Sequence, residues 1–355
     1  MSLPTKAGEI VLNENGIPPF ESLPLREGDP KLAAWGLYGP DDELGTLNRL
    51  TDERVAAAAK SEIRTGVRIS MNWPLNAQQN GSFFNRRTFH QDLFAKPPRT
   101  VNDDIWTFNS QGSSQWDGLR HFGYQKEKVF YNGVTMEDIH GVDEHGGKTS
   151  VNGMQAWAEK GIVGRGVLVD YHSWRERQAE AGSVRHQNFD AFDTTPIPLD
   201  DILACLAAQG TEVKFGDILL IRSGWMHSHA SKTPTELAAL QSSFPNHRFV
   251  GLEQSETTLR WIWENLSAVA GDQPSLECWP TQQAWSLHEV LLAGWGCPIG
   301  ELFHLEKLAE HCAREGRWSF FVASEPCCVD GGVARLVLLF SSSSSPPNLS
   351  SLCHP

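Results

Sequence analysis

The pattern of apolar and polar positions predicts several strands spread along the chain. Residues 165–171 and 216–225 are nearly continuous apolar runs, and runs of this length are typical of strands that are buried on both faces. Residues 67–73 alternate between apolar and polar side chains, as the residues of a half-buried strand do. We expect further strands at residues 268–272 and 318–323. This pattern predicts a sheet whose central strands are buried.

The same pattern predicts helices between the strands. The expected helices cover residues 52–60, 154–160, 199–209 and 256–265. The sequence Ser286-Leu-His-Glu289 is a capping box, in which a serine and a glutamate satisfy each other's backbone amides, and it predicts another helix that ends near Gly294. Residues 298–301 are expected to begin a further helix, whose apolar positions repeat with helical spacing as far as Cys312.

Strands and helices recur along most of the sequence, which predicts the mixed α/β class and one domain over residues 31–335. Residues 1–30 carry prolines and charges without periodicity, and we expect them to form an arm. Residues 336–355 include a run of serines and two adjacent prolines, a composition typical of a disordered tail. The polar segment 76–104 is long for a connection, so we expect an excursion near the site, such as a lid.

The net charge restricts the possible partners, and the cysteine content indicates the redox state of the thiols. The formal net charge is −13, which disfavours nucleic acid and anionic membranes as partners. The seven cysteines form no C-x-x-C pair and are an odd number, so we expect reduced thiols. The first residues lack the apolar core of a secretory signal, and no run of 18 apolar residues is present. We therefore expect a cytoplasmic protein that acts on a small molecule, and its 13 tryptophans favour an aromatic-lined pocket.

One stretch concentrates side chains that can bind a metal or move a proton: Gln111-Gly-Ser-Ser-Gln115-Trp-Asp117-Gly-Leu-Arg-His121. On a strand, residues 111, 115 and 117 would share one face, because side chains alternate with a period of two. Asp117 and His121 are four residues apart across Gly118, so they could orient a base or share a metal. The alternative is a polar turn whose side chains bond to backbone amides.

These residues resemble the signature of the putative cyclase family of hydrolases, His-x-Gly-Thr-His-x-Asp-x-x-x-His, a family that includes bacterial-type kynurenine formamidases and isatin hydrolases. The resemblance extends over roughly residues 35–325, and residues 263–272 and 287–296 look like its long fungal and bacterial branch. The resemblance implies a swivelling β/β/α fold, with a central mixed sheet or barrel flanked by helices. It also implies a metal-dependent hydrolase of amide or lactam bonds that forms a homodimer or a larger homo-oligomer.

The resemblance assigns roles to individual positions. In the family the first two signature histidines and the aspartate bind zinc or manganese, the last histidine acts as a base, and a distal histidine and glutamate complete the site. The corresponding positions here are Gln111, Gln115, Asp117, His121, His288 and Glu301. Two glutamines therefore replace metal-binding histidines, and an amide oxygen is a poorer zinc ligand than imidazole. The remaining oxygen-rich set suits Mn²⁺ or Mg²⁺ better than Zn²⁺, or a site without a metal.

The candidate residues fall into three overlapping groups. The catalytic candidates are Asp117, His121, His288 and Glu301, the candidates for substrate binding are Gln111, Gln115 and Trp116, and the candidates for metal binding are Asp117, Gln115, His288 and Glu301. His288 and Glu301 are each expected near a helix start, where the dipole favours an anion and lowers the pKa of a histidine; their alternative is a pair of capping residues. Asp272, at the end of a predicted strand, is expected to be structural.

Three functions remain open on this evidence. The first is a hydrolase of an amide, lactam or lactone bond in a small molecule, with water activated by Mn²⁺ or Zn²⁺ at Asp117 and Glu301 or, without a metal, by His121. The second is a metal-independent cyclase, dehydratase or isomerase of a natural-product pathway. The third is a non-catalytic binder of small molecules. Metal analysis separates the first function from the other two.

Overall fold

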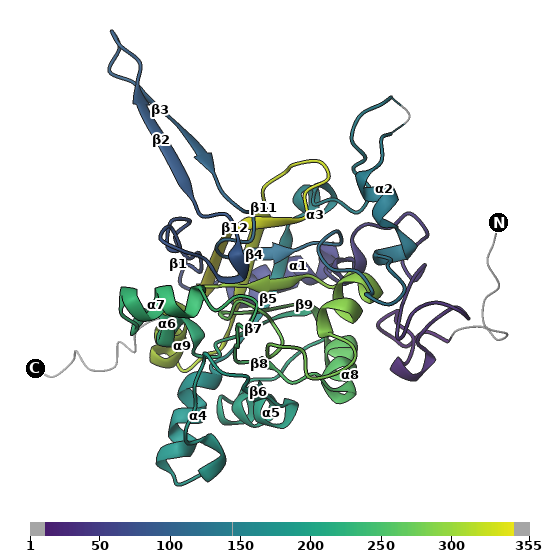
Figure 1. Cartoon of the computed structure of the whole chain (residues 1–355). Helices are drawn as coiled ribbons and strands as arrows, with labels where there is room; N and C mark the ends of the chain where they lie inside the picture. The colour runs from purple at the N-terminus through teal and green to yellow at the C-terminus, as the bar shows by residue number, and fades with distance from the viewer. Residues whose placement is uncertain (1–10, 144, 344–355) are drawn as a thin grey trace, which may run out of the picture.

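A computed structural model describes residues 11–143 and 145–343 of the chain (Figure 1). Within these residues eight strands form one mixed sheet, in the order β1 (Val67–Ser70), β12 (Ala334–Ser343), β11 (Ser319–Pro326), β5 (Ile162–Val169), β7 (Asp217–Ile221), β9 (Leu266–Gly271), β10 (Ile299–Glu301) and β4 (Gln115–Asp117). Strands β5, β7, β9 and β10 are parallel to their neighbours in this series, and the outer pairs are antiparallel. The sheet is therefore mixed, as the sequence predicts.

The sheet curls until its far strand returns to its beginning. Strand β4 pairs with β10 on one side, and it also pairs with residues 334–336 of β12 on the other. The hydrogen-bonded strands between β12 and β4 thus form a closed ring, and β1 continues the sheet beyond the other half of β12. Closing a sheet on itself leaves fewer unpaired edges, and here it fixes β4 from both sides.

Apolar side chains cover both faces of the central strands. All five residues of β7 are buried: Leu219 and Ile221 belong to one apolar cluster, while Ile218 and Leu220 belong to another. This alternation confirms a strand buried on both faces within the apolar run at 216–225, but the strand ends at Ile221 and α6 (Trp225–Ala230) begins at the end of the run. Helices α5 and α8 cover one face and α1 and α3 the other (Figure 1).

The remaining elements surround this core. The helices are α1 (Asp52–Glu62), α2 (Met136–His140), α3 (Gln155–Lys160), α4 (Tyr171–Glu180), α5 (Leu199–Ala208), α6 (Trp225–Ala230), α7 (Pro234–Gln241), α8 (Glu256–Asn265) and α9 (Glu306–Glu315). The short helical turns are η1 (Phe20–Ser22), η2 (Gly45–Arg49), η3 (Phe83–Asn85), η4 (Tyr131–Gly133), η5 (Val184–His186) and the π-helical η6 (Glu289–Gly294). Two small sheets pair β2 (His90–Ala95) with β3 (Asn102–Thr107) and β6 (Pro196–Ile197) with β8 (Gly251–Leu252). None of the helices within the described ranges is long and apolar enough to cross a membrane.

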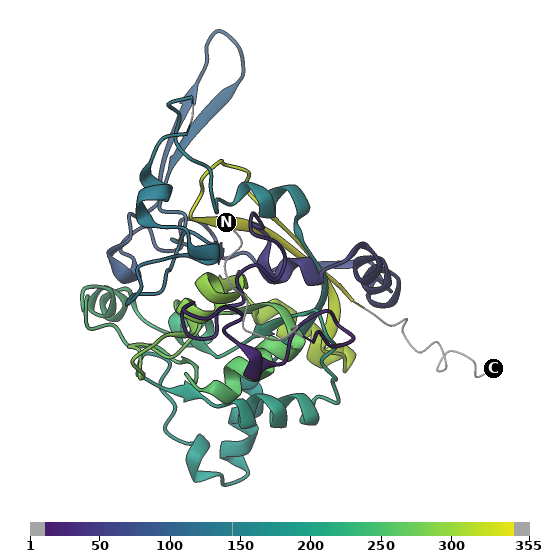
Figure 2. The same cartoon turned by 90° about the vertical axis from the view of Figure 1, so that its right-hand side faces the viewer.

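Three expectations from the sequence are wrong in part. Residues 11–30, expected to be an arm, pack apolar side chains such as Ile17 and Phe20 into the core. The segment 76–104, expected to be a lid, contains β2 and the first residues of β3. The hairpin of these two strands projects from the body in both views (Figures 1 and 2) and exposes every strand residue except Thr107. Residues 336–343, expected to be disordered, belong to β12, and the rest of that segment lies outside the described residues.

The predicted helix start at residues 298–301 is also wrong, because Ile299–Glu301 is strand β10. The helix that follows, α9, begins only at Glu306, and its buried side includes Leu308 and Cys312 as expected. A strand of three residues is too short to show a period of two, so the helical spacing downstream dominated the pattern. The difference matters because Glu301 is a strand residue facing β4.

Candidate functional site

Strand β4 and its neighbour β10 position the first residues of the site. Gln115 and Asp117 lie on one face of the strand, and the neighbouring β10 places Glu301 directly opposite Gln115. The Gln115 side-chain amide donates a hydrogen bond of 3.0 Å to Glu301 Oε2. All three side chains are buried, so two carboxylates and an amide share a small space from which water is largely excluded.

Trp116 lies on the other face of β4. Its ring packs against Phe303 with the ring centroids 5.1 Å apart, and its Nε1 donates a hydrogen bond of 2.9 Å to Ser324 Oγ. The side chain has no exposed surface. Contrary to our expectation that Trp116 binds substrate, it is a core residue, because alternation along the strand turns it away from Asp117.

Gln111 reaches the site from the turn that precedes β4, and not from the strand itself. Its side-chain amide donates a hydrogen bond of 2.8 Å to Asp117 Oδ1 and lies 2.8 Å from His121 Nδ1. The expected proximity of residues 111, 115 and 117 is therefore present, although the chain achieves it with a turn. The second oxygen of Asp117, Oδ2, is left without a hydrogen bond among the described residues.

His121 follows β4 across a tight turn in which its N–H donates a hydrogen bond to the Gly118 carbonyl. A Cβ atom at position 118 would lie 2.3 Å from Met154 Sδ and 2.9 Å from the Val333 carbonyl oxygen, so glycine is required there. His121 Nε2 lies 3.9 Å from Asp117 Oδ2. Burial of the ring lowers the pKa of His121 to about 4, although Asp117 acts in the opposite direction. The imidazole is therefore neutral at neutral pH.

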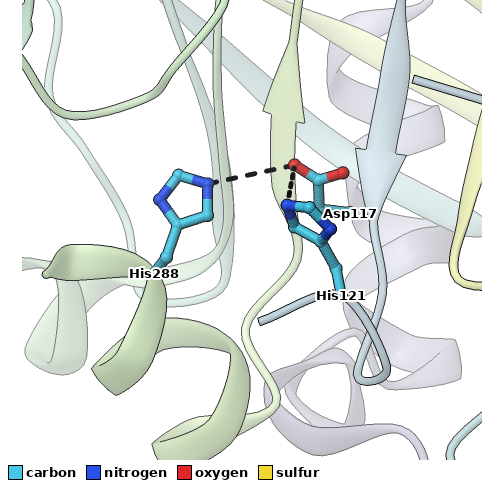
Figure 3. A group of neighbouring side chains, drawn as sticks. All are labelled: Asp117, His121 and His288. Carbon is cyan, nitrogen blue, oxygen red and sulfur yellow. Dashed lines mark ion pairs between the residues drawn. The ribbon is translucent and has the colours of Figure 1, made fainter. Parts of the chain in front are cut away.

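His288 approaches the same carboxylate oxygen as His121, from a different segment of the chain (Figure 3). It directly precedes η6, and the capping box of Ser286 and Glu289 that was predicted at this helix start is present. His288 Nδ1 donates a hydrogen bond of 2.6 Å to Glu277 Oε2. Its Nε2 lies 3.3 Å from Glu301 Oε1 and 4.0 Å from Asp117 Oδ2.

The protonation of His288 and Glu301 follows from this arrangement. Burial alone would lower the pKa of His288, but the charge and hydrogen bond of Glu277, together with Glu301, raise that pKa well above its usual value. Burial, and then the charge of Asp117, raise the pKa of Glu301 to about 7. The expected lowering of the His288 pKa by a helix dipole is thus wrong, because two carboxylates outweigh the dipole. The dipole argument does not apply to Glu301, which is on a strand.

Two residues of the site were not anticipated from the sequence. Glu277, in the loop between β9 and η6, orients His288, and Arg86, which directly follows η3, lines the cavity beside the site. Neither residue belongs to a motif, and each reaches the site through contacts distant in sequence. The one available signal for Arg86 was its position in the polar excursion expected near the site.

A cavity of about 200 Å³ opens onto these groups. Its walls are largely aromatic, formed by Phe84, Phe122 and Trp279 together with Pro274. Its polar lining is Arg86, His121, Ser275, Glu277, His288 and Glu301. The cavity can therefore hold a small, ring-containing molecule with its polar end against the two histidines.

The donor atoms can also hold a divalent cation. Asp117, His121 and His288 each offer one atom within 4.8 Å of the others (Figure 3). Asp117 Oδ2 and Gln115 Oε1 are buried without a hydrogen-bond partner in the described part of the chain, and such oxygen atoms are normally satisfied. A cation bound by Asp117 would satisfy its Oδ2 and would relieve the repulsion between Asp117 and Glu301. The group of Asp117, His121 and His288 offers one carboxylate oxygen and two imidazole nitrogens, so the residues fit a metal that accepts both kinds of ligand, such as Mn²⁺ or Zn²⁺.

Asp272, the other buried acid considered from the sequence, has a structural role as expected. Its carboxylate accepts hydrogen bonds from the Ser223 N–H and hydroxyl and from the N–H groups of Gly224 and Met226. These bonds hold the turn between β7 and α6. The carboxylate has no capacity left for a ligand.

Comparisons with known proteins identify the family and the fold. The sequence profile of a family described as putative cyclase matches residues 46–278. The solved structure of a protein described as a novel cyclase has a TM-score of 0.73 and 31% identity, over 88% of this chain and 100% of that chain. Isatin hydrolase A from Ralstonia solanacearum has a TM-score of 0.53 and 12% identity, over 82% of this chain and 97% of its own. Isatin hydrolase A from Labrenzia aggregata, bound to benzyl benzoate, has a TM-score of 0.51 and 13% identity, over 84% and 100%. No curated protein matches the sequence.

Proposed function

Because the chain belongs to the putative cyclase family, we propose that it hydrolyses an amide, lactam or lactone bond of a small molecule. The observation that carries the proposal is the convergence of Asp117, His121 and His288, since both histidines also line a cavity with aromatic walls. Structural neighbours described as isatin hydrolases act on a molecule of this kind, which supports a ring-containing substrate. An aryl formamide, the type of substrate of kynurenine formamidases, is the next candidate.

His121 serves as the general base. With a pKa of about 4, the imidazole is neutral at neutral pH and able to take a proton from the attacking water. The Gln111 amide, 2.8 Å from Nδ1, holds the ring in place, and Nε2, which lies 3.9 Å from Asp117 Oδ2 and is not bonded to it, is the nitrogen that takes the proton. Positioned proton transfer of this kind contributes roughly 10²–10⁴-fold in rate.

His288 serves as the general acid. Its raised pKa keeps the ring protonated, and Glu277 holds Nδ1 so that Nε2 faces the reacting group. From Nε2 the proton passes to the nitrogen or oxygen that leaves the acyl carbon. Two histidines whose environments move their pKa values in opposite directions divide the roles of base and acid between them.

A divalent metal would be held by the oxygen atoms of Asp117, Glu301 and Gln115. When bound, it supplies a Lewis acid for the substrate carbonyl and lowers the pKa of water. Because these ligands are oxygen atoms, we propose Mn²⁺ in preference to Zn²⁺. Within this assignment Gln111 orients Asp117 and His121 and makes no contact with the metal.

A metal-independent cyclase, dehydratase or isomerase is the second candidate, and one observation favours it. The amides of Gln111 and Gln115 donate hydrogen bonds to Asp117 and Glu301, where the family has imidazoles that bind metal. Hydrogen-bonded acids next to two histidines can move protons without a cation.

The test combines elemental analysis of the purified protein with a screen of aryl formamides, lactams and lactones, each with and without chelator. The proposal predicts hydrolysis that is lost with the chelator and restored best by Mn²⁺. Turnover that survives complete metal removal and adds no water to the product supports the second candidate. Asp104→Asn, on the exposed β3, is a matched control for Asp117→Asn. Light scattering of the same preparation checks the homo-oligomer expected from the resemblance.

A further inference from the structure

Arg86 is a cation that faces the cavity without an acidic partner. It directly follows η3, and its guanidinium lines the cavity next to the Phe84 ring, whose centroid lies 5.2 Å away. Its Nη1 donates a hydrogen bond of 2.7 Å to the Gln111 backbone carbonyl. No carboxylate of the described residues forms an ion pair with it, although the charges of Glu301 and Asp117 act on it from farther away. Its remaining N–H groups are therefore available to a ligand.

The other buried arginines have several acceptors each. Arg49 and Arg120 form no ion pair among the described residues, but each donates at least two hydrogen bonds to backbone carbonyls. Arg165 forms ion pairs with Glu62 and Asp217, and Arg222 forms ion pairs with Asp170 and Glu306. Desolvation of a charge is costly unless a partner compensates it. Arg86 differs from all of these because the Gln111 carbonyl is its one hydrogen-bond acceptor among the described residues, and an anion that arrives with the ligand would supply the missing partner.

The surroundings of Arg86 define that partner. The carboxylates nearest to the cavity are already engaged: Glu277 by His288, and Glu301 by Gln115, His288 and the Leu276 N–H. The walls are aromatic rings that fit a planar ligand. The guanidinium presents a planar fork of donors, which matches both oxygens of a carboxylate.

We propose that Arg86 binds a carboxylate of the substrate, so that the substrate class is an aromatic acid whose scissile acyl bond lies near the ring. The inference rests on the hydrolase function proposed above and specifies its substrate. Arg86 is then a specificity residue: it holds the anionic end while His121 and His288 act on the acyl group.

Binding tests the inference without catalysis. Benzoate and benzamide are a matched pair that differs in charge, and calorimetry measures their Kd values with the wild type, Arg86→Met, Arg86→Lys and Arg87→Met. We expect benzoate to bind more tightly than benzamide, and Arg86→Met to weaken benzoate about tenfold to a hundredfold. Arg86→Lys should restore part of the affinity, and the exposed neighbour Arg87 is the matched control. Equal affinity for the two probes, or an equal loss with Arg87→Met, overturns the inference.

Kinetic measurements distinguish binding of the substrate carboxylate by Arg86 from other roles of this residue. N-formylanthranilate and N-formylaniline share the scissile bond and differ in the carboxylate. We expect Arg86→Met to lower the ratio of their kcat/KM values at least about tenfold, mainly through KM for the acid. Equal losses on both substrates would mean that Arg86 acts on the oxyanion or only supports the Gln111 turn, and would overturn the inference. If neither amide and none of the lactams and lactones of the screen is cleaved while benzoate binding depends on Arg86, the hydrolase proposal fails and the anion subsite stands. Melting curves verify that each variant is folded.

Discussion

Asp117 and Asp272 are two buried carboxylates at strand ends, and the chain treats them in opposite ways. Asp272 follows β9 and accepts four hydrogen bonds from the turn that opens α6. Asp117 ends β4 and accepts one, from Gln111, while its Oδ2 faces two histidines at 3.9 and 4.0 Å without bonding to either. A saturated carboxylate stabilises the local backbone, whereas an unsaturated one is available to a ligand or a proton. Burial alone does not separate the two roles; the count of satisfied lone pairs does.

Replacing each aspartate by asparagine gives the largest contrast. We expect Asp117→Asn to lower kcat/KM at least about 100-fold and to change the free energy of unfolding by less than about 1 kcal/mol. Asp272→Asn should lower the free energy of unfolding by about 2–4 kcal/mol, because it leaves buried N–H groups without an anionic acceptor. Urea denaturation and initial rates measure the two effects. If Asp117→Asn keeps full turnover, Asp117 has no part in catalysis.

The partner of His288 provides the next test, through the pH profile. The base must be neutral and the acid protonated, so activity rises as the pH increases through about 4, where His121 titrates, and falls above the raised pKa of His288. Glu277→Gln removes the negative charge that raises the pKa of His288, so the alkaline limb should move to lower pH. At pH 8 we expect kcat to fall at least about tenfold.

The matched control for this profile is Glu137→Gln, at an exposed position of α2. Its profile should coincide with that of the wild type. An alkaline limb that stays in place in Glu277→Gln would assign the limb to another group.

Replacing Gln115 by the histidine of the family signature tests whether the ligand at this position sets the preference for Mn²⁺ over Zn²⁺. Gln115→His exchanges the unsatisfied Oε1 for a nitrogen ligand, and we expect affinity for Zn²⁺ to rise at least about tenfold relative to Mn²⁺. Competition with a chelator measures both affinities. Gln79→His, at an exposed position, should change neither, and an unchanged ratio in Gln115→His would exclude Gln115 from the metal site.

A substitution on the face of β4 that points away from the site should have the smallest effect on activity. Trp116→Phe loses the hydrogen bond to Ser324 and part of the packing on Phe303. We expect the free energy of unfolding to fall by about 1–3 kcal/mol, with KM changed by less than about twofold. A large rise in KM would return Trp116 to the substrate site.

The sequence predicted the elements whose signals are local. The apolar run that became β7 and the helix α8 (Glu256–Asn265) follow from patterns within ten residues. Asp117 and His121 follow from their spacing and from the family signature. The period of two should have excluded Trp116, because a residue between two site residues on a strand points to the other face.

The rest of the site depends on contacts that no local pattern records. Glu277 meets His288 from a loop eleven positions earlier, and Arg86 meets the Gln111 carbonyl across 25 positions. The pKa of His288 rises because of charges supplied by other segments, so a helix-dipole argument based on the local sequence predicted the wrong direction. Strand β10 is too short to be identified by periodicity, and with it the position of Glu301 could not be derived.

The ring closure that holds β4 between β10 and β12 sets an order for biosynthesis. When residues 115–117 leave the ribosome, their neighbours at 299–301 and 334–336 have not yet been translated. A nascent chain can assemble β5, β7 and β9 with their covering helices first, whereas the strand that carries Asp117 gains its second neighbour only near the end of synthesis. Premature termination before residue 334 would thus yield a product that keeps most of its core and leaves β4 unpaired on one side.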